Sequence, residues 1–201
     1  LQANYQSGKN FKIITLPNKP SNIFKSRKLI LGFDPNLFTK NILKIFFGKK
    51  NFDLKPLKNN LIDEIWKRNI RINQNKFYKL PDRSVGQKYQ TKINKIVSYI
   101  KKKKADYIFI TASENNAWLF NIRGRDTKYS PIPNSYVLID KNKNIKFFCD
   151  LKKISPSFKK KFNKIEFIQK ERTNKCIAEV NKKKFIIDKT TCSFNFESII
   201  S

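Results

Sequence analysis

Short apolar runs alternate with apolar stripes of helical spacing along most of this chain. Continuous runs that are typical of strands lie at residues 28–32, 52–57 and 107–110. Between them, apolar residues recur every three or four positions, as they do on the buried face of a helix. The alternation predicts an α/β fold, in which a mixed β-sheet is flanked by helices.

The clearest helix is predicted from Gln87 to about Lys104. Three lysines, Lys88, Lys92 and Lys95, fall outside its apolar face. The apolar face itself consists of five residues: Tyr89, Ile93, Ile96, Val97 and Ile100.

The remaining pattern predicts further helices and strands and one boundary. A hairpin is expected where two apolar runs, 136–139 and 145–149, flank a polar turn. The polar stretch 67–86 is typical of a linker or a boundary loop. The other expected strands are 11–16, 165–168 and 185–187, and the other expected helices are 1–8, 21–24, 36–48, 61–66, 156–162 and 170–180.

The composition excludes several kinds of chemistry. The chain has no His, so acid–base catalysis by His and metal sites ligated by His are ruled out. The three Cys are odd in number and form no C-x-x-C pair, which favours small buried residues in a reducing compartment. No glycine-rich phosphate loop and no run long enough to span a membrane is present. We therefore assign no catalytic residue and no metal ligand to this chain.

The formal charge of +29 invites a nucleic-acid-binding interpretation. However, 37 Lys stand against 7 Arg, and Lys is encoded by A/T-rich codons, so genome composition can account for much of the charge. Forked contacts to phosphates and bases usually depend on Arg. A basic α/β nucleic-acid-binding module and a stand-alone interaction domain remain as alternative functions.

The segment from Thr111 to Asp126 differs from this background because it contains no Lys. Ser113 is a candidate N-cap for a short helix, and Trp118 and Leu119 are expected to anchor that helix in the core. Arg123 and Asp126 would follow at a turn beyond a strand end, where α/β folds often form clefts. They are candidate cleft-facing residues; the alternative is that they pair with each other or with the backbone.

The same segment resembles a known family. Its sequence from Ala117 to Asp126, Ala-Trp-Leu-Phe-Asn-Ile-Arg-Gly-x-Asp, is followed by Pro131 and by Ser135-Tyr136. This block closely resembles the middle domain of the three-domain Xaa-Pro aminopeptidases. Residues 31–35, Leu-Gly-Phe-Asp-Pro, and 60–66, Asn-Leu-Ile-Asp-Glu-Ile-Trp, also resemble family stretches in the same order.

The resemblance implies two N-terminal domains of the creatinase/prolidase type, with ribonuclease H-like layers. Residues 1–83 would be the C-terminal half of the first domain, and residues 84–201 a nearly complete second domain. The chain would then be a fragment, inactive alone, of a metallo-exopeptidase that releases the N-terminal residue before proline.

The family also implies partners for this portion. Two divalent metal ions, manganese or zinc, would belong to a separate catalytic domain, and this chain would bind no cofactor. It would form part of the wall of the active-site cleft, and together with the catalytic domain it would act on peptide substrates. It would also support a homodimer. We expect a cytoplasmic protein with no specific nucleic-acid partner and no membrane contact.

Overall fold

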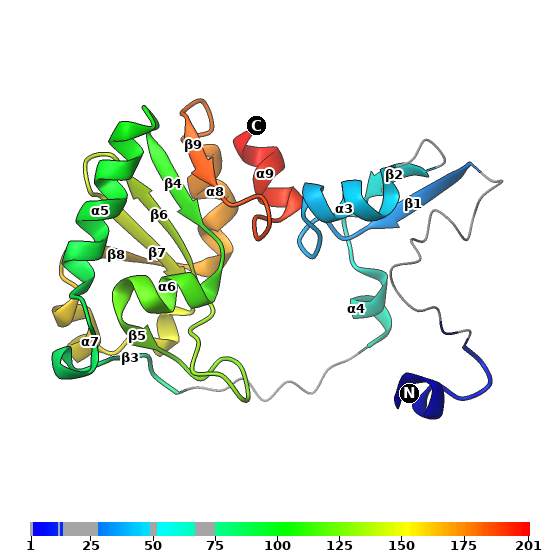
Figure 1. Cartoon of the computed structure of the whole chain (residues 1–201), viewed down its shortest axis with the longest axis horizontal. Helices are drawn as coiled ribbons and strands as arrows, with labels where there is room; N and C mark the ends of the chain where they lie inside the picture. The colour runs from blue at the N-terminus through cyan, green and yellow to red at the C-terminus, as the bar shows by residue number, and fades with distance from the viewer. Residues whose placement is uncertain (1, 12, 14–27, 49–51, 67–74) are drawn as a thin grey trace.

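Five strands form one mixed sheet in the C-terminal part of the chain (Figure 1). The computed structural model describes residues 2–11, 13, 28–48, 52–66 and 75–201. In the sheet, β6 pairs antiparallel with β4 and β7, whereas β8 and β9 pair parallel with β7 and β4. The strand order is β8 (Ile165–Gln169), β7 (Ile145–Cys149), β6 (Tyr136–Asp140), β4 (Tyr107–Ile110), β9 (Phe185–Ile187).

Helices cover both faces of this sheet because successive side chains of its strands point to opposite sides. Val137 and Ile139 belong to one buried cluster, and Leu138 between them belongs to the other. The result is the three-layer α/β architecture that the sequence predicts. The first face is covered by α5 (Tyr89–Lys102), α6 (Ser113–Phe120) and α7 (Pro156–Lys161), and the second by α8 (Thr173–Ala178) and α9 (Phe194–Ile200).

The periodicity identifies the main elements correctly. Helix α5 lies within the predicted span, and Ile93 and Ile100 on its apolar face are fully buried. The predicted hairpin is β6–β7, and the Asp140 carboxylate closes its turn by accepting the backbone N–H groups of Asn142 and Asn144. Helix α9, in contrast, is absent from the prediction.

The predicted linker contains part of the C-terminal unit. Strand β3 (Tyr78–Lys79) pairs antiparallel with β5 (Ile122–Arg123), and Phe77 is buried in the first cluster. Strands of two residues are too short to give a periodic signal, so the pattern could not indicate this pairing. These contacts associate residues 77–79 with the larger unit, and the domain boundary at residue 83 stays a prediction.

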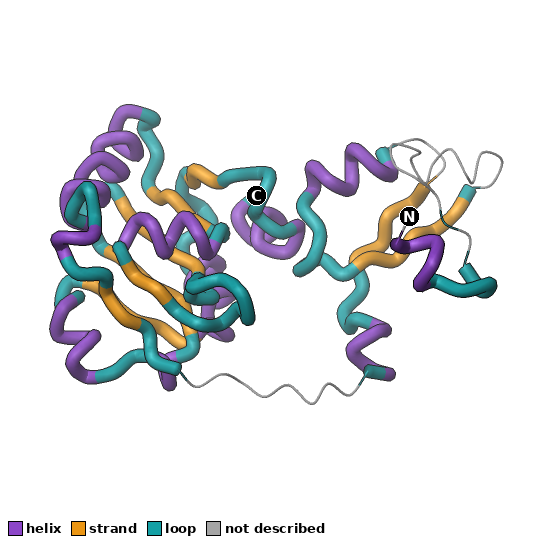
Figure 2. The backbone as a smooth tube through the Cα atoms, turned by 60° about the horizontal axis from the view of Figure 1, so that its bottom comes forward, coloured by secondary structure: helices purple, strands orange, loops and turns teal. Residues whose placement is uncertain are grey.

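A smaller sheet lies apart from the large one, with α9 between them (Figure 2). Its two parallel strands are β1 (Leu29–Phe33) and β2 (Phe52–Pro56). Among the described residues of this part, the helices are α1 (Gln2–Gln6), α3 (Lys40–Phe47) and α4 (Leu61–Ile65), all within predicted helices. The strand expected at 11–16 and the helix expected at 21–24 fall almost entirely outside the described residues.

The three cysteines are free and buried, as the sequence indicates. Burial raises the pKa of the Cys149 thiol to about 12, and it does the same for Cys192. Both are therefore packing residues rather than nucleophiles. Among the described residues, no helix combines the length and the apolar character needed to cross a bilayer.

Gly124 offers a test of the packing between β5 and the loop that follows it. A Cβ at this position would lie 2.8 Å from the Cα of Pro133 and 3.0 Å from the Phe77 ring. We predict that Gly124→Ala lowers the free energy of unfolding by about 1–3 kcal/mol, because a backbone atom cannot yield as a side chain can. Urea denaturation followed by tryptophan fluorescence measures the change.

Gly86→Ala is the matched control, since a Cβ there meets no atom within 4 Å. It should leave the urea midpoint unchanged or raise it slightly. Equal midpoints for the two alanine variants would show that the close approach at Gly124 is not a constraint.

Candidate functional site

The C-terminal half of helix α6 does not bury both of the side chains that the sequence predicts to be buried. Leu119 is 2% exposed, as expected, but Trp118 is 60% exposed, so the prediction that Trp118 is buried is wrong. The helix uses Ala117 and Phe120 together with Leu119 against the sheet, which turns Trp118 to its outer side. An exposed Trp next to charged groups is a common feature of binding surfaces.

Ser113 connects α6 to the start of β6 instead of capping the helix. The N-cap is Ala112, and Ser113 is the first helical residue. The Ser113 hydroxyl donates to the Ser135 carbonyl and accepts from the Ser135 N–H, both at 3.2 Å. The prediction that Ser113 is the N-cap is therefore wrong, because its hydroxyl is hydrogen-bonded to the backbone of Ser135, which is distant in sequence.

Arg123 is half-buried and is the last residue of β5, directly before the turn. Its Nη1 donates to the Ile122 carbonyl at 2.9 Å and to the Ala117 carbonyl at 3.3 Å. The Ala117 carbonyl lies in the last turn of α6, where a positive charge favours the helix dipole, and the Ile122 carbonyl belongs to β5. In the described part of the chain, Arg123 forms no ion pair.

Asp126 is held by a different set of groups. It forms an ion pair with Lys153, and each of these two side chains is only 9% exposed. Its other carboxylate oxygen accepts the backbone N–H of Asn134 at 2.6 Å. The structure thus brings Arg123 and Asp126 into one turn without pairing them, and it gives Asp126 the role of fixing the loop from 126 to 134.

Lys92 is a residue that the sequence analysis missed. It is 4% exposed, and its Nζ donates to the Trp118 carbonyl at 2.5 Å and to the Asn121 side-chain oxygen at 2.6 Å. The ammonium also lies 4.0 Å from the centre of the Trp118 ring, within cation–π distance. Burial and, to a lesser extent, the charge of Arg123 lower the pKa of Lys92.

The spacing of Lys92 from the apolar residues of α5 indicates its position at the edge of the buried face. It lies three residues after Tyr89 and four before Ile96, which puts it beside the apolar face of α5. The many other lysines of the chain hide this position.

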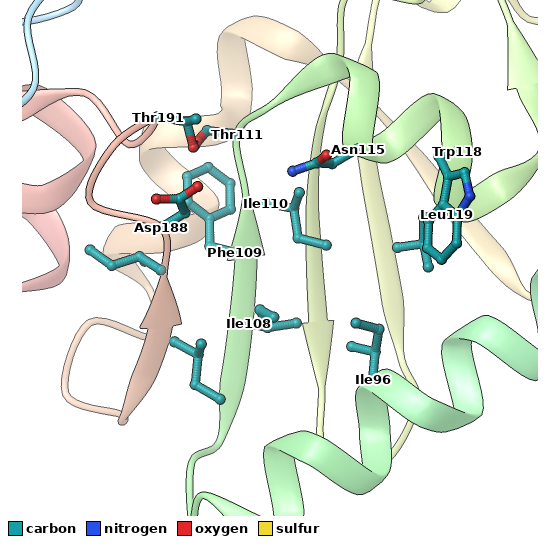
Figure 3. Close-up of a pocket in the computed structure, with 12 residues that line it drawn as sticks. Ile96, Ile108, Phe109, Ile110, Thr111, Asn115, Trp118, Leu119, Asp188 and Thr191 are labelled. Carbon is teal, nitrogen blue, oxygen red and sulfur yellow. The ribbon is translucent and has the colours of Figure 1, made fainter.

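An apolar cavity of about 330 Å³ lies between α5, α6 and the strands β4 and β9 (Figure 3). Ile96, Ile108 and Leu119 form much of its wall, and Trp118 stands at one side. At the opposite side, the hydroxyls of Thr111 and Thr191 are 3.0 Å apart and hydrogen-bonded. Asp188 also lines the cavity, and its carboxylate accepts hydrogen bonds from Thr190, so one polar side borders an otherwise apolar pocket.

The residues of this chain do not fit a pair of metal ions. The sequence has no His, and the described residues contain no group of three or more Cys, Asp or Glu side chains that could hold a metal. Sites for two metals need several carboxylate or imidazole ligands in close proximity. The described residues therefore do not fit a site for two metal ions.

Residues 68–201 match the family model described as the creatinase/prolidase N-terminal domain. The chain belongs to the creatinase/prolidase N-terminal domain family. The domain is 31% identical over 124 residues to a probable Xaa-Pro aminopeptidase P of Coprinopsis cinerea, covering 59% of this chain. It is 30% identical over 141 residues to the Xaa-Pro aminopeptidase app-1 of Caenorhabditis elegans, covering 69% of this chain.

The creatinase/prolidase N-terminal fold also has a solved counterpart. The crystal structure of X-prolyl aminopeptidase from Caenorhabditis elegans, described as a cytosolic enzyme with a di-nuclear active site, superposes with a TM-score of 0.77. The match covers 87% of this chain and 30% of that one, at 24% identity. The chain spans 20% and 23% of the lengths of the two curated relatives. The fold predicted from the sequence resemblance is confirmed.

The buried ion pair gives a testable difference between two aspartates. We predict that Asp126→Ala lowers the free energy of unfolding by about 3–5 kcal/mol, because it leaves the Lys153 ammonium buried without its partner. Thermal and urea denaturation measure the change.

Asp82→Ala is the matched control, since Asp82 forms an exposed pair with Lys79 at 2.7 Å. Exposed pairs contribute little, so this variant should unfold close to wild type. Similar stabilities for the two variants would contradict the structural role of Asp126.

Proposed function

We propose that this chain is a non-catalytic N-terminal portion of an Xaa-Pro aminopeptidase, a metallopeptidase that releases the N-terminal residue preceding proline. The observation that carries the proposal is the family match over residues 68–201 together with relatives named as Xaa-Pro aminopeptidases. The chain corresponds to a fraction of their length, which leaves room for catalysis elsewhere in such a protein.

In this proposal, the two divalent metal ions, manganese or zinc, are held by a catalytic domain outside these residues. The donor set of the chain supports that assignment, because no cluster of ligands occurs among the described residues. The chain itself would wall the cleft, limit access to peptides and support a homodimer. The description of the Caenorhabditis elegans enzyme as cytosolic supports a cytoplasmic location.

Arg123 and Asp126 would lie on the side of the domain that faces this cleft. The backbone contacts of Arg123 involve only Nη1, so the rest of its guanidinium can bind another group. Asp126 is engaged with Lys153 and the Asn134 N–H, which makes it a positioning residue for the loop.

The purified chain should not hydrolyse an Xaa-Pro peptide in the presence of manganese or zinc. The reason is the absence of His from the sequence and of clustered ligands from the described residues. Release of the N-terminal amino acid is measured with the Caenorhabditis elegans enzyme as positive control. Metal-dependent turnover by this chain above the metal-only blank would refute the assignment as non-catalytic.

Arg123→Ala, placed in a polypeptide that also carries the catalytic domain, separates the two roles of this side chain. If Arg123 faces the cleft, kcat/KM should fall at least tenfold, which is about 1.4 kcal/mol, while the melting temperature changes little. A lowered melting temperature with unchanged activity per folded molecule would make Arg123 a structural clamp only. Lys102→Ala, an exposed change far along α5, controls for the loss of one charge.

A further inference from the structure

Two cations share one pocket at the C-terminal end of α6. Lys92 and Arg123 both line a cavity of about 320 Å³, together with Asn121 and Trp118. Residues 84–87 line the same cavity. Two positive side chains at one small pocket repel each other unless an anion lies between or beside them.

No carboxylate of the described residues provides that anion. The ion pairs found in the described part of the chain involve neither Lys92 nor Arg123. Asp82, in the 3₁₀ turn that leads to this wall, is bound by Lys79. The carbonyls at the end of α6 contribute about half a negative charge, which leaves a surplus of more than one positive charge at the pocket.

The neighbouring start of α5 increases this surplus. Its first turn contains no acidic residue, and its N-cap is Lys88, whose side chain makes no capping hydrogen bond. The positive end of the α5 dipole is therefore not balanced by a side chain.

Hydrogen-bond donors remain for a ligand as well. The Lys92 ammonium donates two of its three N–H groups to Trp118 and Asn121 and also lies against the Trp118 ring, so it supplies the pocket mainly with charge. Arg123 has five donors, and its contacts with the described residues involve Nη1 alone. The planar guanidinium can bind two oxygens of one carboxylate or phosphate in a fork.

We propose that this pocket is an oxyanion-binding site, in which Lys92 and Arg123 bind the carboxylate or phosphate group of a ligand. Trp118 forms an aromatic wall beside the anion and can contact the apolar part of the same ligand. Gly86 leaves the pocket open, because even a Cβ at this position would meet no atom within 4 Å.

The test uses the ¹⁵N-labelled 201-residue chain, titrated with acetate or with inorganic phosphate while chloride keeps the ionic strength constant. The site predicts saturable shifts of the Trp118 indole N–H and of the Arg123 Nε–H. Arg123→Gln should weaken the binding at least tenfold. Lys102→Gln removes the same charge from the exposed far end of α5 and should change the affinity less than twofold.

A second variant keeps the test decisive if Arg123→Gln does not fold. Gly86→Asp introduces a carboxylate on a residue that lines the pocket, at a position where a Cβ meets no atom within 4 Å. It should abolish anion binding and raise the melting temperature, because the new carboxylate takes the place of the ligand. Folded Gly86→Asp that binds the anion as wild type does would overturn the proposal.

The probes also separate specific binding from diffuse attraction to a chain of formal charge +29. Tighter binding of acetate would identify a carboxylate ligand, and tighter binding of phosphate would identify a phosphorylated one. Shifts that grow linearly with concentration, or an equal loss in Arg123→Gln and Lys102→Gln, would overturn the proposal. Neither result depends on whether the protein is an aminopeptidase.

Discussion

The left-handed turn at Asn121 is the constraint on which the larger unit depends. Asn121 ends α6 with φ 55° and ψ 39°, a conformation that Asn tolerates better than most residues. Its side chain donates to the Gln87 carbonyl at 2.9 Å and accepts from Lys92, and its carbonyl accepts from the Leu80 N–H. One residue thereby joins α5, α6 and the residue that follows β3.

That turn determines where the following residues lie. By reversing the chain after α6, it places Ile122 in the buried cluster and puts β5 beside β3. Gly124 then passes close to Phe77 and Pro133, where a side chain has no room. The candidate residues Arg123 and Asp126 owe their positions to this path rather than to a contact with each other.

The sequence predicts those parts of the fold that arise from local periodicity. Helix α5 and the β6–β7 hairpin follow from apolar spacing within one segment, and the structure confirms both. The two-residue strands β3 and β5 are different, since they pair residues more than forty positions apart and contain too few residues for a pattern. The same holds for Ser113, whose partner Ser135 lies in another element.

The sequence predicts only part of the candidate site, again because the remaining part depends on contacts between different elements. The absence of Lys between Thr111 and Asp126 indicated the segment, but burial of Trp118 could not be judged from its apolar character. Its position depends on Lys92, which approaches from a different helix and lies against the ring. In a chain with 37 Lys, composition gives no means of telling a buried lysine from the solvated majority.

Helix α9, whose N-cap is Ser193, connects the larger unit to the smaller sheet through its first two backbone N–H groups. The first backbone N–H groups of a helix have no partner within it. In α9, the N–H groups of Phe194 and Asn195 donate to the Phe38 and Pro35 carbonyls, at 2.7 and 2.9 Å. The Phe194 ring also packs edge-on against Phe33, with centroids 5.0 Å apart.

These contacts make the start of α9 a shared element of both parts of the chain. The Phe38 and Pro35 carbonyls come from the loop between β1 and α3, so the smaller sheet satisfies donors that the larger unit leaves open. Lys40 adds charge to the same junction, because its Nζ lies 3.8 Å from the Glu197 carboxylate and faces the Phe194 ring. Loss of the smaller sheet would therefore leave the Phe194 and Asn195 N–H groups without their acceptors, with only the Ser193 cap remaining at this end, and would weaken the helix that covers the second face of the large sheet.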